Sequence, residues 1–429
     1  MIRHAINQTM LLLLVGLWWG MAATVHAANV TNEPGGELTL AEALTLADAH
    51  QPELHAARLD VQAAESRVTQ AALLPNPGFL LEAENFGGNN ELKSYDVAEY
   101  TAQLEQTIEV GGKRRKRIRI AETERHLTAF DLDAKRLDIR AETVRRFVSL
   151  QGAQERLALS RESLAIAEEF VRVVVARVRA GKVSPMEEDK AQILLVQQKV
   201  ILDSAQRKLL SARVQLSAMW GSATPRFDRA TGDLQAIPTV PDLPVLALRM
   251  PANPDLARWT AEVEQREATL AKEKAARLPD VTVAGGVRRF AEIDSEAFVA
   301  GLFVPLPVFD RNQGKVREAV VILEKAEQQR RAAEVTAAAA LAEAYQTLSA
   351  ALNRIAILKN DIIPRSKSVF DAVQSGYTQG KFAYLDVLDA RRTFFDTRSE
   401  YIEALVSGHK ALANVERVVG GALPVPENN

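Results

Sequence analysis

The chain has 429 residues, and its 53 lysines and arginines nearly balance its 55 aspartates and glutamates. A formal net charge of −2 gives it no bulk attraction to nucleic acid. The absence of cysteine excludes disulfides, thiolate metal sites and a lipid anchor on an N-terminal cysteine. The six histidines form no helical metal pattern, and no nucleophile–base pattern or phosphate loop stands out. We therefore expect no enzyme activity, no cofactor and no metal site.

Residues 1–27 have the features of an export signal. A short basic start at Arg3 and His4 precedes a compact apolar run at 10–19, and Ala27 supplies a small residue before a cut. The run is too short to span a membrane, and no later stretch approaches about 20 uninterrupted apolar residues. We expect the mature chain to reside in the periplasm, in the outer membrane or outside the cell.

The first repeat, residues 28–224, begins with helical periodicity and then changes to strand periodicity. Apolar residues at 38–74 recur at three- and four-residue spacings, and Pro52 allows a break within that helix. At about 78–110 apolar residues alternate with polar ones, as they do in a strand. Roughly ten alternating residues is the length of a strand that crosses an outer membrane. We therefore expect a β-hairpin of membrane length.

Residues 113–220 are predicted to form two long antiparallel helices. From Lys113 to Ala180 there is no proline, which allows about 100 Å of helix at 1.5 Å per residue. A short break at 181–185 folds the second helix back on the first. A seven-residue apolar repeat runs through both helices and indicates supercoiling. It comprises Leu150, Leu157, Leu164, Val171, Val178, Leu195, Leu202, Leu209 and Leu216.

The second half of the chain repeats the first. A proline-rich linker at 225–251 is followed by a second repeat at 252–421 and a tail at 422–429. The second repeat contains a helix, a β-hairpin at about 280–306 and a helical hairpin at 313–420 with an internal break at Pro364. At one constant offset the two halves match Gly181 with Gly380, Ala191 with Ala390, and Gly221 with Gly420. A register held this long indicates duplication.

Four strands per chain constrain the assembly. Four strands cannot close a barrel, and lipid does not tolerate open sheet edges. The smallest membrane barrels have about eight strands, so a membrane-inserted chain must assemble at least as a dimer. The alternative is that the hairpins are small soluble sheets that cap helical bundles, because strand alternation is a weak signal. The export signal and the long flanking helices favour the membrane.

Three stretches resemble the TolC family of outer-membrane efflux ducts. Residues 74–77 followed by 82–88 are similar to the family's opening strand, and residues 106–114 to its second strand and the exit into the long helix. Residues 377–380 with 385–390 are similar to its periplasmic tip motif. The opening strand most resembles the branch that partners cobalt–zinc–cadmium and nickel exporters, and the second strand is similar to that branch too. The resemblance covers essentially the whole mature chain.

The resemblance implies a mainly helical chain with a small β part, whose helical hairpins form two internal repeats. It implies a homotrimer whose twelve strands close one barrel among the lipids of a Gram-negative outer membrane. The helices would continue the barrel as a tunnel into the periplasm. A periplasmic membrane-fusion adaptor and an inner-membrane RND-type pump would feed that tunnel. The implied function is the duct of a tripartite system that exports divalent heavy-metal cations.

The resemblance places the gate of this duct at the far end of the helical hairpins. Asp386 and Asp389 are three residues apart on one helix face and would form carboxylate rings at the constriction. From the residues alone, acids in a first helical turn equally complement the helix dipole. Phe382 stands where some members carry a basic residue, so we expect no closing salt bridge there. The other tip residues are Glu187, which matches Asp386, the family tyrosine Tyr377, and the turn glycines Gly181 and Gly380.

Two other functions are open at this stage. One is a duct for drugs, solvents or a polypeptide in type I secretion, and the other is a soluble periplasmic coiled-coil adaptor. An adaptor would place one helical hairpin between lipoyl-like β segments, whereas this chain has two hairpins. The basic run at 113–117 lacks interleaved aromatics, so we interpret it as a solvated collar near anionic headgroups.

Overall fold

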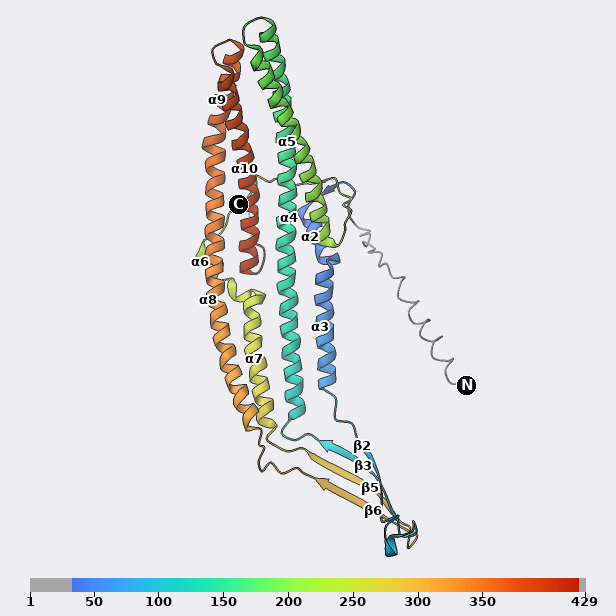
Figure 1. The fold of residues 1–429 in the computed structure, drawn as a ribbon. Coiled ribbons are helices and arrows are strands. Elements are labelled where there is room, and N and C mark those ends of the chain that lie inside the picture. The colour runs from blue at the N-terminus through green and yellow to red at the C-terminus, as the bar shows by residue number, and fades with distance from the viewer. Residues whose placement is uncertain (1–32, 424–429) are drawn as a thin grey trace, which may run out of the picture.

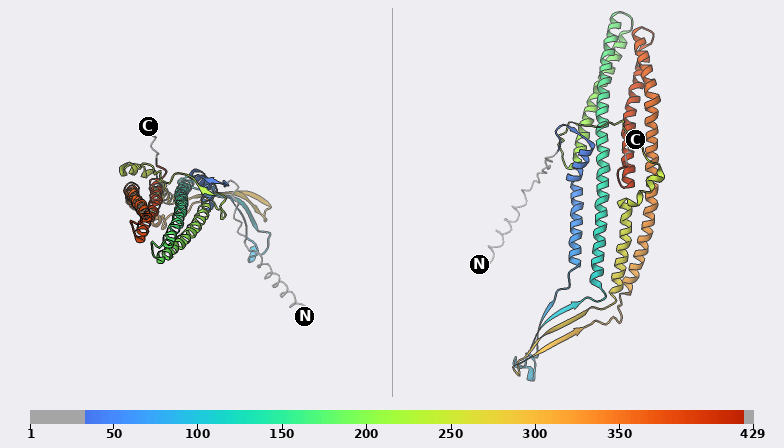
Figure 2. Two further views of the ribbon diagram at one scale, coloured as in Figure 1. Left: turned by 90° about the horizontal axis from the view of Figure 1, so that it is seen from above. Right: turned by 180° about the vertical axis from the view of Figure 1, so that it is seen from behind.

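The computed structural model describes residues 33–423. The export signal expected at 1–27, and all but the first residues of the 422–429 tail, lie outside the described residues. Figure 1 and Figure 2 show an elongated molecule with a sheet at one end and the tips of two helical hairpins at the other. Within 33–423, no helix combines the length and the apolar character needed to cross a membrane.

The sheet has four antiparallel strands in the order β2-β3-β5-β6. They are β2 (Gly78–Glu84), β3 (Glu99–Ile108), β5 (Val281–Phe290) and β6 (Ser295–Phe303). The pairing sets Leu81 opposite Ala102, Ala102 opposite Val287 and Val287 opposite Phe298, so alternate residues line one face. That face is apolar and exposed, with Phe298 93% accessible. The other face carries Glu82, Glu84, Glu99, Thr101, Gln103, Glu105, Thr107, Thr282 and Arg288.

Each half of the chain builds one long helix with two shorter helices beside it. In the first half these are α4 (Lys113–Arg179), flanked by α3 (Pro52–Ala71) toward the sheet and by α5 (Pro185–Ser217) toward the tip. Two short elements adjoin them, α2 (Leu40–His50) before α3 and η2 (Ala218–Trp220) after α5. Gln51 has an extended backbone and Pro52 opens α3, because proline lacks the N–H that a first helical residue does not need.

The second half has the same arrangement around a helix that is interrupted once. Its long helix comprises α8 (Gln313–Ile357), the π-helical turn η4 (Leu358–Ile362) and α9 (Ile363–Thr378). It is flanked by α7 (Pro254–Ala275) toward the sheet and by α10 (Tyr384–Val419) toward the tip. The expected break at Pro364 is therefore one wide turn just before the proline, and the helix continues beyond it. A π turn accommodates the missing proline N–H without ending the helix.

The matched positions of the two halves have matched conformations. Gly181 and Gly380 end the first helix of each hairpin with φ of +67° and +78°. Gly221 and Gly420 follow the second helix with φ of +76° and +88°. A left-handed residue after a helix satisfies its last carbonyls, and glycine adopts this conformation without a Cβ clash. Ala191 and Ala390 are both buried, at 0% and 6% exposure. The two repeats join where α4 packs against α7 and α10.

The linker between the repeats is structured. Its β4 (Arg229–Ala230) pairs in parallel with β1 (Glu37–Leu38), and it also contains α6 (Leu243–Ala247) and η3 (Met250–Ala252). A further short turn, η1 (Asn90–Leu92), lies in the β2–β3 loop. Fully buried linker side chains, Phe227 and Leu246, anchor the linker to the helices. The linker crosses the helices about midway between sheet and tips (Figure 1).

The basic run at 113–117 lies where the sheet meets the long helix and is partly exposed, and several of its side chains also make structural contacts. Arg117 and Arg114 donate to the carbonyls of residues 71–73 at 2.7–2.9 Å, where α3 ends. Lys113 Nζ lies 2.7 Å from Asp280 Oδ1. The last carbonyls of a helix have no partner inside it and carry partial negative charge, so cations are favoured there. The run therefore caps α3 and joins the sheet to the long helix.

Candidate gate at the helical tips

The two tips are built by the same sequence of turns. Gly181 N donates to Val178 O at 2.9 Å, and Lys182 N donates to Arg177 O at 2.9 Å. In the second repeat Gly380 N donates to Tyr377 O at 3.0 Å, and Lys381 N to Gly376 O at 2.9 Å. Both are C-terminal caps closed by a left-handed glycine. The next helix then begins within a few residues, so each tip is a short turn whose backbone is held by these hydrogen bonds.

The acid in the first turn of the second helix has a different partner in each repeat. Before α5, the hydroxyl of Ser184 accepts from Met186 N at 3.3 Å, and Glu187 accepts from a side chain of the other hairpin. Before α10 the corresponding residue is Ala383, which has no hydroxyl to accept a backbone N–H. Asp386 turns back, and its Oδ2 accepts from a different donor, Ala383 N, at 2.8 Å. The two matched acids therefore have different partners.

Glu187 and Tyr377 link the two hairpins. The Tyr377 hydroxyl donates to Glu187 Oε2 at 3.0 Å, and the guanidinium of Arg177 lies 4.3 Å from the centre of the tyrosine ring. Arg177 also donates to the carbonyl of Tyr377. We call this set of three residues from α4, α5 and α9 the tip link. It joins the first hairpin to the second with a charge-assisted hydrogen bond and a cation–π contact.

Tyr377 is held in an apolar layer directly behind the turns. Its side chain is 2% exposed and contacts Phe170, whose ring centre is 5.4 Å from its own. Burial, followed by the hydrogen bond to Glu187, raises the pKa of Tyr377 to about 12. The hydroxyl therefore stays protonated and donates throughout the physiological range. The same layer contains Val174, Ala191, Val373, Tyr384, Val387 and Ala390.

Asp386 and Asp389 both lie exposed on α10 and line one groove. The groove has a volume of about 840 Å³ and runs between η4, α9 and α10. Arg365 and Asp361 from the other side of the groove also line it. The structure thus places the two aspartates on one accessible face, as their spacing predicts. Their membership of a carboxylate ring stays a prediction, because a ring requires further copies of the chain.

Phe382 packs within its own turn. A Cβ added at Gly376 would overlap with the Phe382 ring, so the ring lies directly on the backbone of α9. Phe382 itself offers no charge for a closing salt bridge. Here an aromatic ring covers the glycine instead, and the tip link takes its cation from Arg177.

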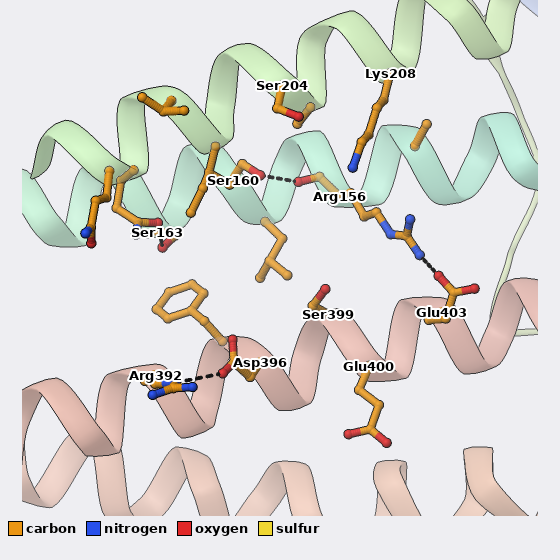
Figure 3. Close-up of a pocket in the computed structure, with 18 of the residues that line it drawn as sticks. Arg156, Ser160, Ser163, Ser204, Lys208, Arg392, Asp396, Ser399, Glu400 and Glu403 are labelled. Carbon is orange, nitrogen blue, oxygen red and sulfur yellow. Dashed lines mark hydrogen bonds and ion pairs between the residues drawn. The ribbon is translucent and has the colours of Figure 1, made fainter. Parts of the chain in front are cut away.

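Behind the tip, a second groove of about 1650 Å³ lies between α4, α5 and α10 (Figure 3). Its walls carry small polar side chains, among them Ser160, Ser163 and Ser204. Ion pairs cross it or border it, including Arg156 with Glu403, and Arg392 with Asp396 at 3.4 Å. Within residues 33–423 no group of three or more histidines, aspartates or glutamates is arranged to hold a metal ion.

Arg177 is a site residue that the sequence did not reveal. It sits four residues before Gly181, and no motif or spacing connects it with a tyrosine two hundred residues later. Only the folded arrangement of the two repeats brings them together. The sequence did not reveal Arg391 of α10 for the same reason.

Both repeats match one family of known proteins. Residues 43–222 and 248–421 match the family described as outer membrane efflux protein. The chain belongs to the outer membrane efflux protein family. This confirms the resemblance seen in the strand and tip motifs, and it makes the chain an outer-membrane protein of the efflux class.

Individual relatives carry the comparison further. The chain is 36% identical to the cobalt-zinc-cadmium resistance protein CzcC of Cupriavidus metallidurans over 388 residues, 90% of this chain and 91% of that protein. It is 28% identical to the nickel-cobalt-cadmium resistance protein NccC of Alcaligenes xylosoxydans xylosoxydans, over 63% of this chain and 61% of that one. Its fold matches the crystal structure of the outer membrane protein VceC of Vibrio cholerae with a TM-score of 0.73 at 18% identity, over 89% of this chain and 96% of that chain.

Proposed function

We propose that the chain is the duct of a tripartite efflux system that exports divalent heavy-metal cations across the envelope. The likeness to CzcC, 36% over nine-tenths of the chain, is the observation that carries the choice of metals. The duct would be a homotrimer, fed by a periplasmic adaptor and an inner-membrane RND-type pump. A trimer would supply twelve strands, enough to close a barrel, and its helices would continue as a tunnel.

The polar face of the sheet supports a path for cations. Arg288 pairs with Glu84 at 3.3 Å and with Glu99 at 2.8 Å. Glu82 and Glu105 on the same face form no ion pair with any described residue of 33–423, so the face is acidic. Closure of the sheet with the apolar face toward lipid turns this acidic face inward. Carboxylates that line a pore raise the local concentration of cations.

The helical tips supply the gate. The arrangement held by the tip link is the closed state, because Tyr377 and Glu187 bind the two hairpins together. Asp386 and Asp389 line the constriction, where copies from three chains place like charges near one another. A ring of this kind favours cations over anions.

The substrate is tested with a deletion strain. Loss of the gene is expected to lower the concentration of cobalt, zinc, cadmium or nickel at which growth stops, and a plasmid copy is expected to restore it. Sensitivity to hydrophobic drugs with unchanged metal tolerance would contradict the metal assignment and favour a drug duct. Release of the protein by osmotic shock, without membranes, would contradict the duct altogether and favour an adaptor.

The gate is tested by removing its charge. The double variant Asp386→Asn and Asp389→Asn is expected to lower the cation selectivity of the channel in planar bilayers. Asp203→Asn is a matched control, because Asp203 is an exposed acid on α5 that pairs with Arg207 at 2.8 Å. Selectivity and conductance equal to wild type in the double variant would refute the assignment of the two aspartates.

A further inference from the structure

Arg391 is a buried cation, and the acid whose charge acts on it, Asp396, is paired with Arg392 instead. Arg391 lies on α10, two residues after Asp389, and its side chain is 6% exposed. Its Nη2 donates to Ser163 O at 3.2 Å and to Ser163 Oγ at 2.6 Å, while its Nε has no hydrogen-bond partner. The guanidinium lies 5.2 Å from the ring centre of Phe395. Within residues 33–423 Arg391 forms no ion pair. Its neighbour Arg392, in contrast, is exposed and pairs with Asp396.

The contacts of Arg391 make a second connection between the two hairpins. Ser163 on α4 accepts a hydrogen bond from Arg391. Its hydroxyl also donates to Gln198 Oε1 on α5 at 2.8 Å, so the three residues form one chain of hydrogen bonds. Ser163 and Gln198 are 5% and 8% exposed. We call Arg391, Ser163 and Gln198 the second link. It lies behind the tip link and borders the groove in which Figure 3 labels Ser163.

The second link is incompletely satisfied in the closed state. A guanidinium has five N–H donors, and here one neutral serine accepts from it. Burial of a charge without a partner carries a large desolvation cost. Burial also lowers the pKa of Arg391 from its ordinary value, in keeping with that cost. Nearby, the Tyr384 hydroxyl is buried and has no hydrogen-bond partner either. Separation of the hairpins would expose the two unpartnered atoms, Arg391 Nε and the Tyr384 hydroxyl, to water.

We propose that Arg391 is a positioning residue of the gate. Its buried charge, which has no ion pair among the described residues, raises the free energy of the closed tip relative to the open tip. Ser163 supplies the hydrogen bonds that make this burial tolerable. The tip link holds the hairpins together, and the charge of Arg391 opposes it. This inference rests on the proposed gate and adds to it a residue that tunes how readily the gate opens.

The proposal predicts opposite effects for the two members of the link. Arg391→Met keeps the length and apolar character of the stem but removes the charge, so it should lower the ratio of open to closed channels about fivefold or more. Ser163→Ala removes an acceptor and leaves the charge, so it should raise that ratio about tenfold. In the double variant the charge is gone, and the serine substitution should have little further effect.

The measurement is the open probability of single channels of the reconstituted full-length protein in planar bilayers. Arg391→Lys separates charge from packing, because lysine keeps the charge and offers fewer donors. It should open at least as often as wild type. Arg207→Met, at an exposed arginine of α5 that pairs with Asp203 at 2.8 Å, is the matched control and should leave the open probability unchanged.

The outcomes separate the inference from the gate on which it rests. Tyr377→Phe should raise the open probability, and failure of this variant would refute the gate itself. If Tyr377→Phe and Arg391→Met both raise the open probability, the gate stands and only the inference about Arg391 is overturned. This result would show that the contacts of Arg391 with Ser163 and Phe395 stabilise the closed tip by more than the burial of its charge costs. Equal effects of methionine and lysine at 391 would overturn it as well, because the side chain would then act by packing.

Discussion

Single residues explain why two nearly identical tips act differently. Glu187 accepts from Tyr377 of the other hairpin, whereas Asp386 accepts from the backbone N–H of Ala383 at the start of its own helix. The sequence placed Tyr377 at the tip through a family resemblance and Glu187 through its match with Asp386 in the other repeat. It did not reveal their hydrogen bond, because the partner of an acid depends on which neighbouring donor remains unsatisfied. Arg177 and Arg391 were out of reach for a related reason, since a cation in a long helix is usually solvated.

The tip link predicts a pH dependence at the residue scale. Burial and Glu187 raise the pKa of Tyr377 from 10.0 to about 12, so the closed tip holds the phenolic proton more tightly than an open, hydrated tip. The contribution of Tyr377 to closure is therefore complete below pH 10 and is lost as the pH rises from 10 toward 12. We expect the open probability in planar bilayers to be flat up to about pH 10 and to rise above it.

Two variants check this pH dependence. Tyr377→Phe should show a higher baseline and a smaller alkaline rise, because the buried Tyr384, with a pKa also raised to about 12, remains. Tyr95→Phe, in the exposed β2–β3 loop, should follow wild type. An alkaline rise of equal size in Tyr377→Phe and wild type would assign it to other groups.

At the scale of elements, periodicity carried most of the prediction and failed where elements are short. The strands were visible because alternation persisted for seven to ten residues in each of them. The two-residue strands β1 and β4 have no period to detect, so the sequence predicted only a proline-rich linker at 225–251. Pro364 marked the right place in the long helix, but proline chemistry alone does not distinguish a full break from a π turn.

The close contact between α4 and α10 predicts that a methyl group added at Gly152 lowers the stability of the protein. Gly152 of α4 faces Val406 of α10 so closely that a Cβ at 152 would overlap with Cγ2 of the valine. Gly152→Ala should destabilise the protein by about 1–3 kcal/mol, because a tightly packed interface must separate to accept the methyl group. Thermal unfolding in detergent, followed by circular dichroism, measures the effect.

A matched glycine in another helix controls for helix propensity. Gly314, near the start of α8, has open space where its Cβ would lie, so Gly314→Ala should be neutral or stabilising by up to about 1 kcal/mol. Val406→Ala should partly rescue Gly152→Ala, since it removes the overlapping methyl. Destabilisation of equal size at 152 and 314 would show that the close approach is not responsible.

At the scale of the whole molecule, the sheet cannot be complete in one chain. The edge strands β2 and β6 pair on one side only, and the face with Phe79, Leu81, Phe298 and Leu302 is 68–93% exposed. The sequence indicated this incompleteness by its strand count alone. It could not give the number of copies, because the angle between neighbouring chains depends on how whole repeats pack together.

The absence of cysteine makes the number of copies directly measurable. Leu80 on β2 and Val299 on β6 lie on the same face of the sheet, but two strands separate them. At about 4.8 Å per strand spacing they are roughly 14 Å apart within a chain, too far for a disulfide. A disulfide between cysteines at these edges must therefore join two chains.

We predict that a double variant with Leu80→Cys and a cysteine at 297, 299 or 301 forms covalent dimers and trimers and nothing larger. Each chain contributes one β2 edge and one β6 edge, so a closed ring of three chains stops growing at the trimer. Oxidation in outer-membrane preparations, followed by non-reducing electrophoresis, shows the series of bands. Each single-cysteine variant is the control and should form no trimer. A series of bands that ends at the dimer or continues beyond the trimer would refute the twelve-stranded ring. If only one position of the second cysteine gives efficient trimers, that position fixes the register of β2 against β6 between chains.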